Sequence, residues 1–427
     1  MINHWLSRNS TVAFLKSLKG NPRYCIITEP MWSIPWALYF PFFTLYMFNL
    51  GLQDADIGIL ISVGLFMQMF TALLAGVLTD KYGRRLVTLV GDLVAWSIPV
   101  LIWAFAQDFR WFLVAAIFNS FRQVSSISWQ CILVEDAPQD KIVQLYNMIY
   151  IAGQLAVFFS PISIFFIGVH GLVPVMRVIF ILTFVCMTLK FIIFYFYSTE
   201  TEHGVIRLKE TAGVPLFKLL AEYSSVFKQI LRTPATWRVL LLITLLNIQQ
   251  IASTNFFALY VTQDLGLPEQ FLTLFPFLNA IIMLIFFLGL QGMFNRFPQY
   301  MIMLAGLGLY ICGFVLLILT PPGMIFLLVV FTVIDSCAAA SFLPRRDALV
   351  FQNADPADRA RIVSLLTVIM LGVSSPFGVI IGRLSGIDRR IPFAICIGLF
   401  ILMGIIVSME RKKGRDENNE PTAVKDR

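Results

Sequence analysis

The feature that most constrains this chain is a succession of long apolar segments, separated by short polar ones, over almost its whole length. An α-helix needs about 20 mainly apolar residues to cross a lipid bilayer. Twelve segments meet that requirement, with each end placed to within about four residues. They are 24–49, 55–79, 86–106, 110–133, 141–168, 173–198, 236–263, 268–294, 299–319, 323–349, 360–384 and 389–409. The sequence therefore predicts an all-α membrane protein with twelve transmembrane helices.

The composition agrees with a membrane location. Hydrophobic residues make up 58% of the chain and charged residues 13%, against about 45–50% and about 25% in soluble globular proteins. Basic residues give a net charge of +7. Such residues collect in the short cytoplasmic loops of membrane proteins, so no nucleic-acid partner is expected. The six Cys residues stand singly without CxxC spacing, so we expect no disulfide framework, metal site or cofactor.

The N-terminal residues contain no apolar core of signal-peptide length. Their Lys and Arg residues are spread along the stretch "MINHWLSRNSTVAFLKSLKGNPR". Two interpretations stay open: a short basic helix on the membrane surface, or a disordered cytosolic tail.

The distribution of basic residues predicts the orientation. They lie before the first segment, after the second, in the central linker, at the end of the tenth segment and after the last; examples are Lys16, Lys19, Arg23, Lys81, Arg84, Arg85, Arg345, Arg346, Arg411, Lys412 and Lys413. The stretch "RLSGIDRR" (383–390) is an exception, because it is basic yet predicted outside. We therefore expect a multi-pass protein of the cell membrane with both termini cytoplasmic.

The chain also repeats itself at an offset of about 215 residues. "FTLYMFNLGLQ" (43–53) returns as "FALYVTQDLGLP" (257–268), and "APQDKIVQL" (137–145) returns as "DPADRARIVSL" (355–365). We predict two six-helix halves in the same orientation. The predicted parts are a cytoplasmic N-terminal segment, a first half, a cytoplasmic linker with an amphipathic helix, a second half and a cytoplasmic tail, at 1–23, 24–198, 199–235, 236–409 and 410–427.

A charged motif interrupts the apolar sequence between the second and third segments. Within "GVLTDKYGRRLVTLVGD" (76–92), six residues fit the pattern G-x-x-x-D-[RK]-x-G-R-[RK]: Gly76, Asp80, Lys81, Gly83, Arg84 and Arg85. Gly76 permits close helix approach, Gly83 permits a tight turn, and Asp80 can pair with neighbouring bases or receive a helix N-terminus. On position alone, the bases merely set the topology.

This motif resembles the loop 2–3 signature of the major facilitator superfamily, and the two tandem halves resemble that family's parallel repeats. The resemblance implies twelve helices in two pseudo-symmetric halves and solute transport by alternating access. It also implies that the charged motif is a conformational latch between the halves. The matching loop of the second half, "GLQGMFNRFPQ" (289–299), keeps only Arg296, which predicts a one-sided latch.

In this family the first, fourth, seventh and tenth helices line a central cavity, and ionisable residues within a membrane are functional candidates. Arg122 lies about 18 Å into the fourth segment at helical rise, and Asp335 lies equally deep in the tenth. Two interpretations stay open. Either the two residues form a static buried ion pair, or Asp335 carries a proton while Arg122 modulates it or binds substrate.

The first and seventh segments supply further candidates. Glu29 precedes Pro30, and the three prolines of this segment (30, 35 and 41) predict a broken helix with free backbone carbonyls. The predicted cavity residues are Glu29, Trp36, Tyr39, Arg122, Asn247, Gln250, Asn255 and Asp335. The aromatic residues also suit an interfacial belt, and the polar run of the seventh segment also suits contacts between helices. Arg177 and Lys190 carry no functional prediction, since Lys190 can snorkel.

The sequence therefore predicts a monomeric, proton-coupled secondary transporter that moves a small solute by alternating access. Coupling to sodium stays open, as do the efflux of an amphipathic compound and the uptake of a polar solute. Lipid movement on the same fold and a non-transporting sensor remain alternatives. An enzyme or ATP-driven pump is not expected, because no G-x-x-x-x-G-K-[ST] loop is present. Proton-driven drug antiporters of this family carry a Gly-x₃-Gly-Pro-x₂-Gly-Gly-like signature in the fifth helix. The fifth segment here, "GQLAVFFSPISIFF", keeps Gly153 and Pro161 without the following glycine pair, which weakens an assignment as a drug antiporter.

Overall fold

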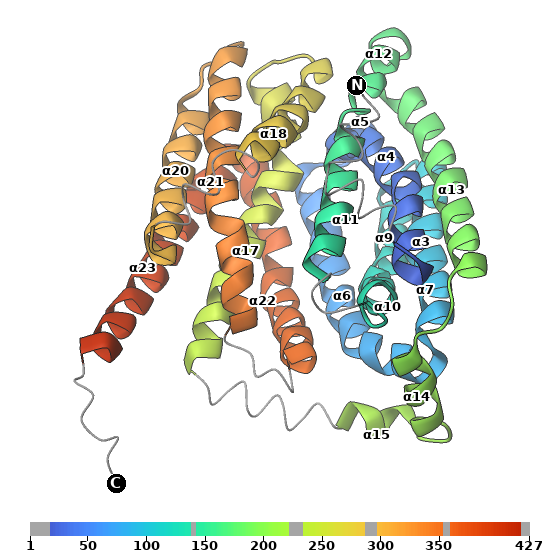
Figure 1. The fold of residues 1–427 in the computed structure, drawn as a ribbon. Coiled ribbons are helices and arrows are strands. Elements are labelled where there is room, and N and C mark those ends of the chain that lie inside the picture. The colour runs from blue at the N-terminus through green and yellow to red at the C-terminus, as the bar shows by residue number, and fades with distance from the viewer. Residues whose placement is uncertain (1–17, 138–141, 222–233, 287–296, 353–358, 420–427) are drawn as a thin grey trace, which may run out of the picture. The chain divides into compact units, whose positions relative to one another are not determined.

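The computed structural model describes residues 18–137, 142–221, 234–286, 297–352 and 359–419. All regular elements within these ranges are helices (Figure 1). Contacts divide the chain into two compact units. The first comprises Met1–Gly51 and Val63–Ser224, and the second comprises Leu52–Ser62 and Ser225–Arg427.

The first unit consists of helices that follow one another with short connections (Figure 1). They are α3 (Gly20–Thr28), α4 (Pro30–Tyr39), η1 (Phe40–Phe42), α5 (Phe43–Asn49), most of α6 (Asp54–Tyr82), α7 (Arg84–Asp92), η2 (Leu93–Ser97), α8 (Ile98–Phe105), α9 (Phe109–Asn119), α10 (Arg122–Val134), α11 (Ile142–Val157), α12 (Pro161–His170), α13 (Leu172–Tyr197), α14 (Glu202–Glu210) and α15 (Leu216–Ala221). Helix α13 contacts α4, α7 and α8, while α10 contacts α7 and α11 contacts α4.

Pro30 and Pro41 mark breaks in the first apolar segment, as the sequence predicts, but Pro35 lies inside α4 and does not end that helix. Helix α3 ends just before Glu29, and Pro30 occupies the first position of α4. Proline is tolerated there because the first turn of a helix has no internal acceptor for its missing N–H. Pro41 lies in the short η1 helix that follows. These breaks place the Glu29 carboxylate at a helix junction.

The fourth apolar segment is interrupted near its middle. Helix α9 ends at Asn119, and α10 begins at Arg122 after a two-residue turn. Asn119 Nδ2 donates to the carbonyl of Ala95, 2.8 Å away, and the Ser120 hydroxyl donates to the carbonyl of Ile117. The Thr71 hydroxyl of α6 donates to the carbonyl of Ser120 at 2.7 Å. The turn is thus fixed by side chains, and Arg122 is the first residue of the helix that follows.

The second unit contains the first turns of α6 together with the remaining helices (Figure 1). These helices are α17 (Pro234–Leu259), η4 (Tyr260–Asp264), η5 (Glu269–Thr273), α18 (Leu274–Ile285), α20 (Gln299–Leu319), α21 (Ile325–Gln352), α22 (Arg359–Ile387) and α23 (Ile391–Asn419). Aromatic rings fill the space between α20, α21 and α23: Tyr310 stacks on Phe400 with centroids 4.6 Å apart, and Phe314 packs against Phe331 and Phe400.

Nine helices within the described residues are long and apolar enough to cross a membrane. The three predicted segments outside this set have identifiable reasons. Segment 24–49 is divided by its prolines, segment 110–133 by its central turn, and segment 268–294 extends beyond the described residues after the apolar stretch Glu269–Ile285. The all-α membrane fold is confirmed, while the count of twelve stays a prediction.

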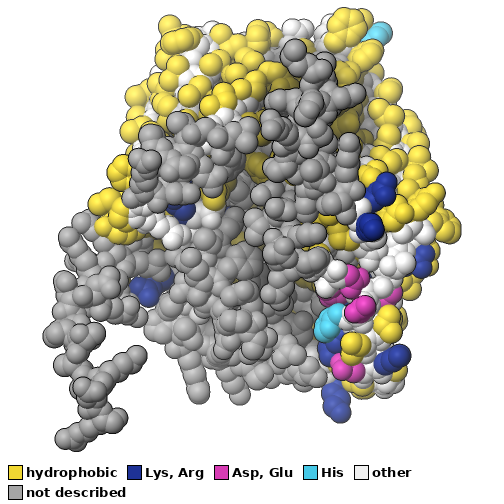
Figure 2. Space-filling view, viewed as in Figure 1, with side chains coloured by type: hydrophobic (Ala, Val, Ile, Leu, Met, Phe, Trp, Pro, Cys, Tyr) yellow, Lys and Arg dark blue, Asp and Glu magenta, His cyan; other side chains and the backbone are white. Residues whose placement is uncertain are grey.

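Some predictions fall on residues outside the described ranges. These are most of the N-terminal segment, the second part of the linker, Arg296 and the end of the C-terminal tail. The described part of the linker forms α14 and α15. On the visible face, Asp, Glu, Lys and Arg side chains gather at the lower right (Figure 2), where α14 and α15 are drawn in Figure 1. Such charged helices fit an aqueous environment at one end of the first unit.

Candidate functional site

The first unit contains a cavity of about 380 Å³ that is lined by charged, polar and aromatic side chains. Its walls come from the α3–α4 junction, α4, α7, η2, α10, α11 and α13. The lining residues are Glu29, Trp32, Asp92, Trp96, Arg122, Gln123, Ser125, Ser126, Trp129, Ile149, Lys190 and Phe191. Two acids and two bases therefore face one cavity within an apolar helical unit.

Glu29 and Lys190 form a buried ion pair across this cavity. Lys190 Nζ lies 3.1 Å from Glu29 Oε2, and the side chains of Lys190 and Glu29 are 7% and 9% exposed, respectively. The ammonium group also lies 5.9 Å from the ring centroids of Trp32, Trp129 and Phe191, within the range of cation–π attraction. The sequence predicts Glu29 as a cavity residue but makes no functional prediction for Lys190.

Asp92 is the second acid of the cavity, and the sequence analysis gives it no role. It is the last residue of α7, whose packing against α10 sets its position. The Thr88 hydroxyl donates to Ser128 Oγ at 2.8 Å. A Cβ added to Gly91 would lie 3.0 Å from Cβ of Ser125, so glycine best allows this approach. Within the described residues, Asp92 forms no ion pair shorter than 4 Å.

Arg122 is held by a neutral side chain. Its Nε donates to Gln68 Oε1 at 3.0 Å, and Gln123 Nε2 donates to the same oxygen at 3.1 Å. Gln68 is buried on α6. In the part of the chain that the structure describes, no side chain or backbone oxygen accepts a hydrogen bond from the two terminal nitrogens of Arg122. Its charge and most of its donors therefore stay available to a ligand.

Tryptophans form much of the remaining wall. Trp32 meets Trp96 edge to face with centroids 5.1 Å apart, and it stacks on Trp36 at 6.0 Å. The indole N–H of Trp129 is buried with no acceptor among the described residues. Tyr39, a predicted cavity residue, is instead 2% exposed. It packs between Trp103 and Phe180, away from this lining.

The remaining predicted cavity residues lie in the second unit. Asp335 on α21 has no hydrogen bond or ion pair with the residues described. On α17, Asn255 Nδ2 donates to the carbonyl of Ile251 in its own helix. Asn247 Nδ2 is buried with no acceptor among the described residues, and Gln250 is exposed. These polar residues are not part of the cavity in the first unit.

The signature motif forms a charge network within the first unit. The Asp80 carboxylate lies 3.0 Å from Arg84 and 2.8 Å from Arg207 of α14. Arg84 in turn lies 3.1 Å from Glu135. The hydrogen bond to Asp80 raises the pKa of Arg207. The Thr201 hydroxyl donates to Glu135 as well, so the linker is tied to the motif.

Gly83 and the residues beside it form the start of α7. Gly83 has a φ of +84°, a region that favours glycine. The Glu200 carboxylate accepts hydrogen bonds from the backbone N–H of Arg84 (2.9 Å) and Arg85 (3.1 Å), which places a negative charge at a helix N-terminus. Lys81 Nζ donates to the carbonyl of Val214. Residues of the motif and of the linker thus contact one another beside the N-terminus of α7.

A second charge cluster lies at the other end of α6, within the second unit. Asp54 accepts hydrogen bonds from the Ser385 hydroxyl at 2.6 Å and from Arg389 Nε at 3.0 Å. Arg389 Nη1 also contacts Asp264 at 3.0 Å. Burial would lower the pKa of Arg389, but its hydrogen bonds and charge interactions with Asp54 and Asp264 raise it. Arg389 of the basic stretch 383–390 therefore has two acidic partners.

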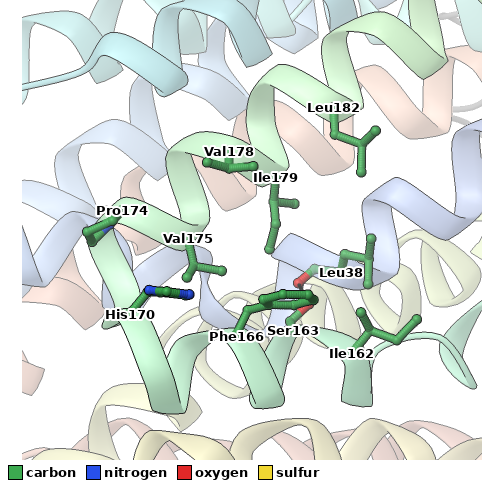
Figure 3. A pocket seen from close by; sticks show the side chains of 10 residues that line it. All are labelled: Leu38, Ile162, Ser163, Phe166, His170, Pro174, Val175, Val178, Ile179 and Leu182. Carbon is green, nitrogen blue, oxygen red and sulfur yellow. Dashed lines mark hydrogen bonds between the residues drawn. The ribbon is translucent and has the colours of Figure 1, made fainter.

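A second cavity, of about 470 Å³, lies beside α12 and α13 and is almost entirely apolar (Figure 3). Its lining residues are Leu38, Ile162, Ser163, Phe166, His170, Pro174, Val175, Val178, Ile179 and Leu182. The Ser163 hydroxyl already donates to the carbonyl of Leu38. Val178 is 66% exposed. This groove suits a lipid chain and offers little to a polar solute.

The sequence matches the family model of the Major Facilitator Superfamily over residues 32–333. The chain belongs to the major facilitator superfamily. No curated protein sequence is similar enough to count as a relative. The fold of this superfamily member is similar to that of the nucleoside transporter NupG, with a TM-score of 0.66 and 16% identity over 92% of this chain and 99% of that one.

Peptide transporters show the same fold. A POT family transporter in complex with a thioalcohol-conjugated peptide has a TM-score of 0.69 and 14% identity, covering 92% of this superfamily member and 96% of its own chain. The peptide transporter POT in complex with sulfate has a TM-score of 0.67 and 16% identity over 92% and 94% of the two chains. The protein is thus a multi-pass membrane transporter rather than an enzyme, as predicted.

Proposed function

We propose that this protein is a proton-coupled secondary transporter of a small polar solute, working by alternating access, with the charged cavity of the first unit as its solute site. The observation that carries the proposal is the gathering of Glu29, Asp92, Arg122 and Lys190 around one cavity. Ionisable side chains are costly within a membrane and are retained mainly for function. A static core would not need four of them.

Proton coupling is supported by the acids. A transporter that uses a proton gradient needs carboxyl groups that gain and lose a proton during the cycle. Among the described residues, neither Asp92 at the cavity nor Asp335 in the second unit forms an ion pair within 4 Å, which makes both of them candidates. Glu29 differs from them, because it is paired with Lys190 at 3.1 Å.

The signature motif is proposed to control the exchange between conformations. Asp80 binds both Arg84 and Arg207, so a change in this network also moves the linker. The proposed members of the latch are Gly76, Asp80, Lys81, Gly83, Arg84 and Arg85. The distribution of Lys and Arg supports cytoplasmic termini, and we propose that the protein works as a monomer in the cell membrane.

Thermal-shift screening followed by transport assays tests this proposal. Purified protein is heated with sugars, organic acids, nucleosides, amino acids, lipids and cationic drugs, because a ligand of the folded state raises the melting temperature. Ligands found in this way are assayed in proteoliposomes under a pH gradient or a sodium gradient. We expect accumulation that follows the pH gradient. Accumulation that follows sodium alone, or no accumulation of any binding solute, contradicts the proposal.

Lipid movement is the alternative function that the apolar groove beside α12 and α13 favours. Its lining contains no Asp, Glu, Lys or Arg to hold a charged headgroup. The same screen separates the two functions. A fluorescent phospholipid that crosses proteoliposome membranes faster with the protein than without it, while no polar solute binds, favours lipid movement.

A further inference from the structure

We infer that the solute of the first unit's cavity is a singly charged anion with a flat, apolar body, and that it binds together with one proton taken up by Asp92. This inference rests on the proposed function and names the class of its substrate. Three features of the cavity carry it: an arginine with free donors, walls of tryptophan, and balanced charges.

Arg122 provides the anion site. Its Nε is used by Gln68, whereas its terminal nitrogens have no acceptor among the described residues. A guanidinium group binds a carboxylate or phosphate through two parallel hydrogen bonds. Because Gln68 is neutral, it orients Arg122 without cancelling its charge. By contrast, Lys190 already has Glu29 as its counterion.

The tryptophans suit a flat apolar group. Trp32, Trp96 and Trp129 come from three different elements and line the same cavity as Arg122. Aromatic rings stack or meet edge to face with planar ligands. A small anion that lacks a flat apolar group would make no contact with these rings. An aromatic or otherwise planar acid therefore fits the lining better than acetate or inorganic phosphate.

The charges of the cavity call for one proton per anion. Glu29 and Asp92 balance Lys190 and Arg122, so the cavity is neutral when all four are charged. An added monoanion would leave one buried negative charge, and protonation of Asp92 removes it. Asp92 is favoured over Glu29 because only Glu29 has an ion pair. The Cys25 thiol and the Tyr39 phenol lie outside the lining and are ordinarily uncharged, so they do not alter this balance.

A matched ligand panel tests the inference. Calorimetric titrations at pH 6 compare 2-naphthoate and benzoate with the neutral 2-naphthamide, the cationic benzylamine and the small anion acetate. We expect the aromatic acids to bind at least roughly tenfold more tightly than the amide, amine or acetate, since a charged hydrogen-bonded pair is worth about 1.5–3 kcal/mol. Tighter binding of the amide or the amine overturns the inference.

Variants locate the anion. Arg122→Gln should weaken 2-naphthoate binding roughly 10- to 100-fold, and Arg122→Lys should restore part of the affinity. The control Arg110→Gln, at an exposed arginine, should bind normally. Melting temperatures close to that of the unaltered protein show that each variant folds. Equal binding by Arg122→Gln and the unaltered protein overturns the assignment.

The panel also separates this inference from the proposed function. If a neutral or cationic solute binds in the cavity and its transport follows the pH gradient, the proposed function stands and the anion assignment fails. If aromatic acids bind through Arg122 but no pH gradient drives their transport, the proposed coupling fails while the assignment of the anion site stands.

Discussion

Glu29 in the first unit and Asp335 in the second are both acids in apolar helices, yet their surroundings differ. Glu29 lies 3.1 Å from Lys190 and shares its cavity with Asp92 and Arg122. Asp335 has no basic partner within the described residues. Its neighbour Ser336 is bound to Asn279 and to its own helix instead. The two acids are therefore expected to respond in opposite ways to the loss of charge.

The presence or absence of a basic partner distinguishes two roles of a buried carboxyl group. An ion-paired acid keeps its charge, because its partner stabilises the charged form. An acid without a partner is stable in a low-dielectric setting mainly when it is protonated. The first arrangement ties the α3–α4 junction to α13, whereas we propose that the second serves the exchange of a proton.

The largest effect should come from breaking the ion pair. Lys190→Met leaves Glu29 buried without a counterion and should lower the free energy of unfolding by about 3–5 kcal/mol. The double variant Glu29→Gln/Lys190→Met should recover most of this loss. Asp335→Asn, which removes no partner, should leave stability unchanged or higher. Reversible unfolding in detergent micelles measures all three, and equal stability of Lys190→Met and Asp335→Asn would remove the contrast.

Asp335 should matter for transport more than for stability. Asp335→Asn is expected to abolish accumulation of solute against a gradient, because its amide cannot exchange a proton. It should still permit counterflow exchange, which requires no net proton movement. Proteoliposomes loaded with unlabelled solute provide the counterflow assay. If Asp335→Asn accumulates solute with ordinary pH dependence, Asp335 is structural and the acids of the first cavity become the better candidates.

The smallest effect should come from the signature motif, which contains neither Glu29 nor Asp335. Asp80→Asn removes the charge that binds Arg84 and Arg207 and should slow transport roughly fivefold, for a change of about 1 kcal/mol in the conformational barrier. Solute affinity should stay the same. Glu210→Gln is the matched control, because Glu210 also binds Arg207 but is 55% exposed. Unchanged transport rates in both variants would reduce the motif to a topology signal.

The sequence predicts the fold well because its signals are local. Apolar length gives the helices, and Pro30 and Pro41 mark the breaks of the first segment. Glu29 is also predicted to face a cavity, since an acid beside a proline in a membrane segment is far more stable against polar groups than against lipid. The family follows from a motif in which six residues lie within ten positions.

The rest of the site depends on contacts between distant residues. Lys190 alone resembles a lysine that snorkels, and only the fold brings it to Glu29, 161 positions away. Asp92 stands at the end of the motif stretch, where a charge also suits a helix terminus. Arg389, which departs from the topology rule, likewise binds Asp54, 335 positions away. A side chain's partner in space is not encoded in the local pattern.

The central claim, that Asp92 takes up the proton that accompanies anion binding, is tested most directly by the pH dependence of that binding. A protonated Asp92 leaves the cavity with a net positive charge, so the affinity for 2-naphthoate should fall as the pH rises from about 5 to about 8. Calorimetric titrations of the unaltered protein, Asp92→Asn and Asp335→Asn make the comparison. The account predicts that Asp92→Asn binds with nearly constant affinity while Asp335→Asn keeps the decline; the reverse pattern would contradict it.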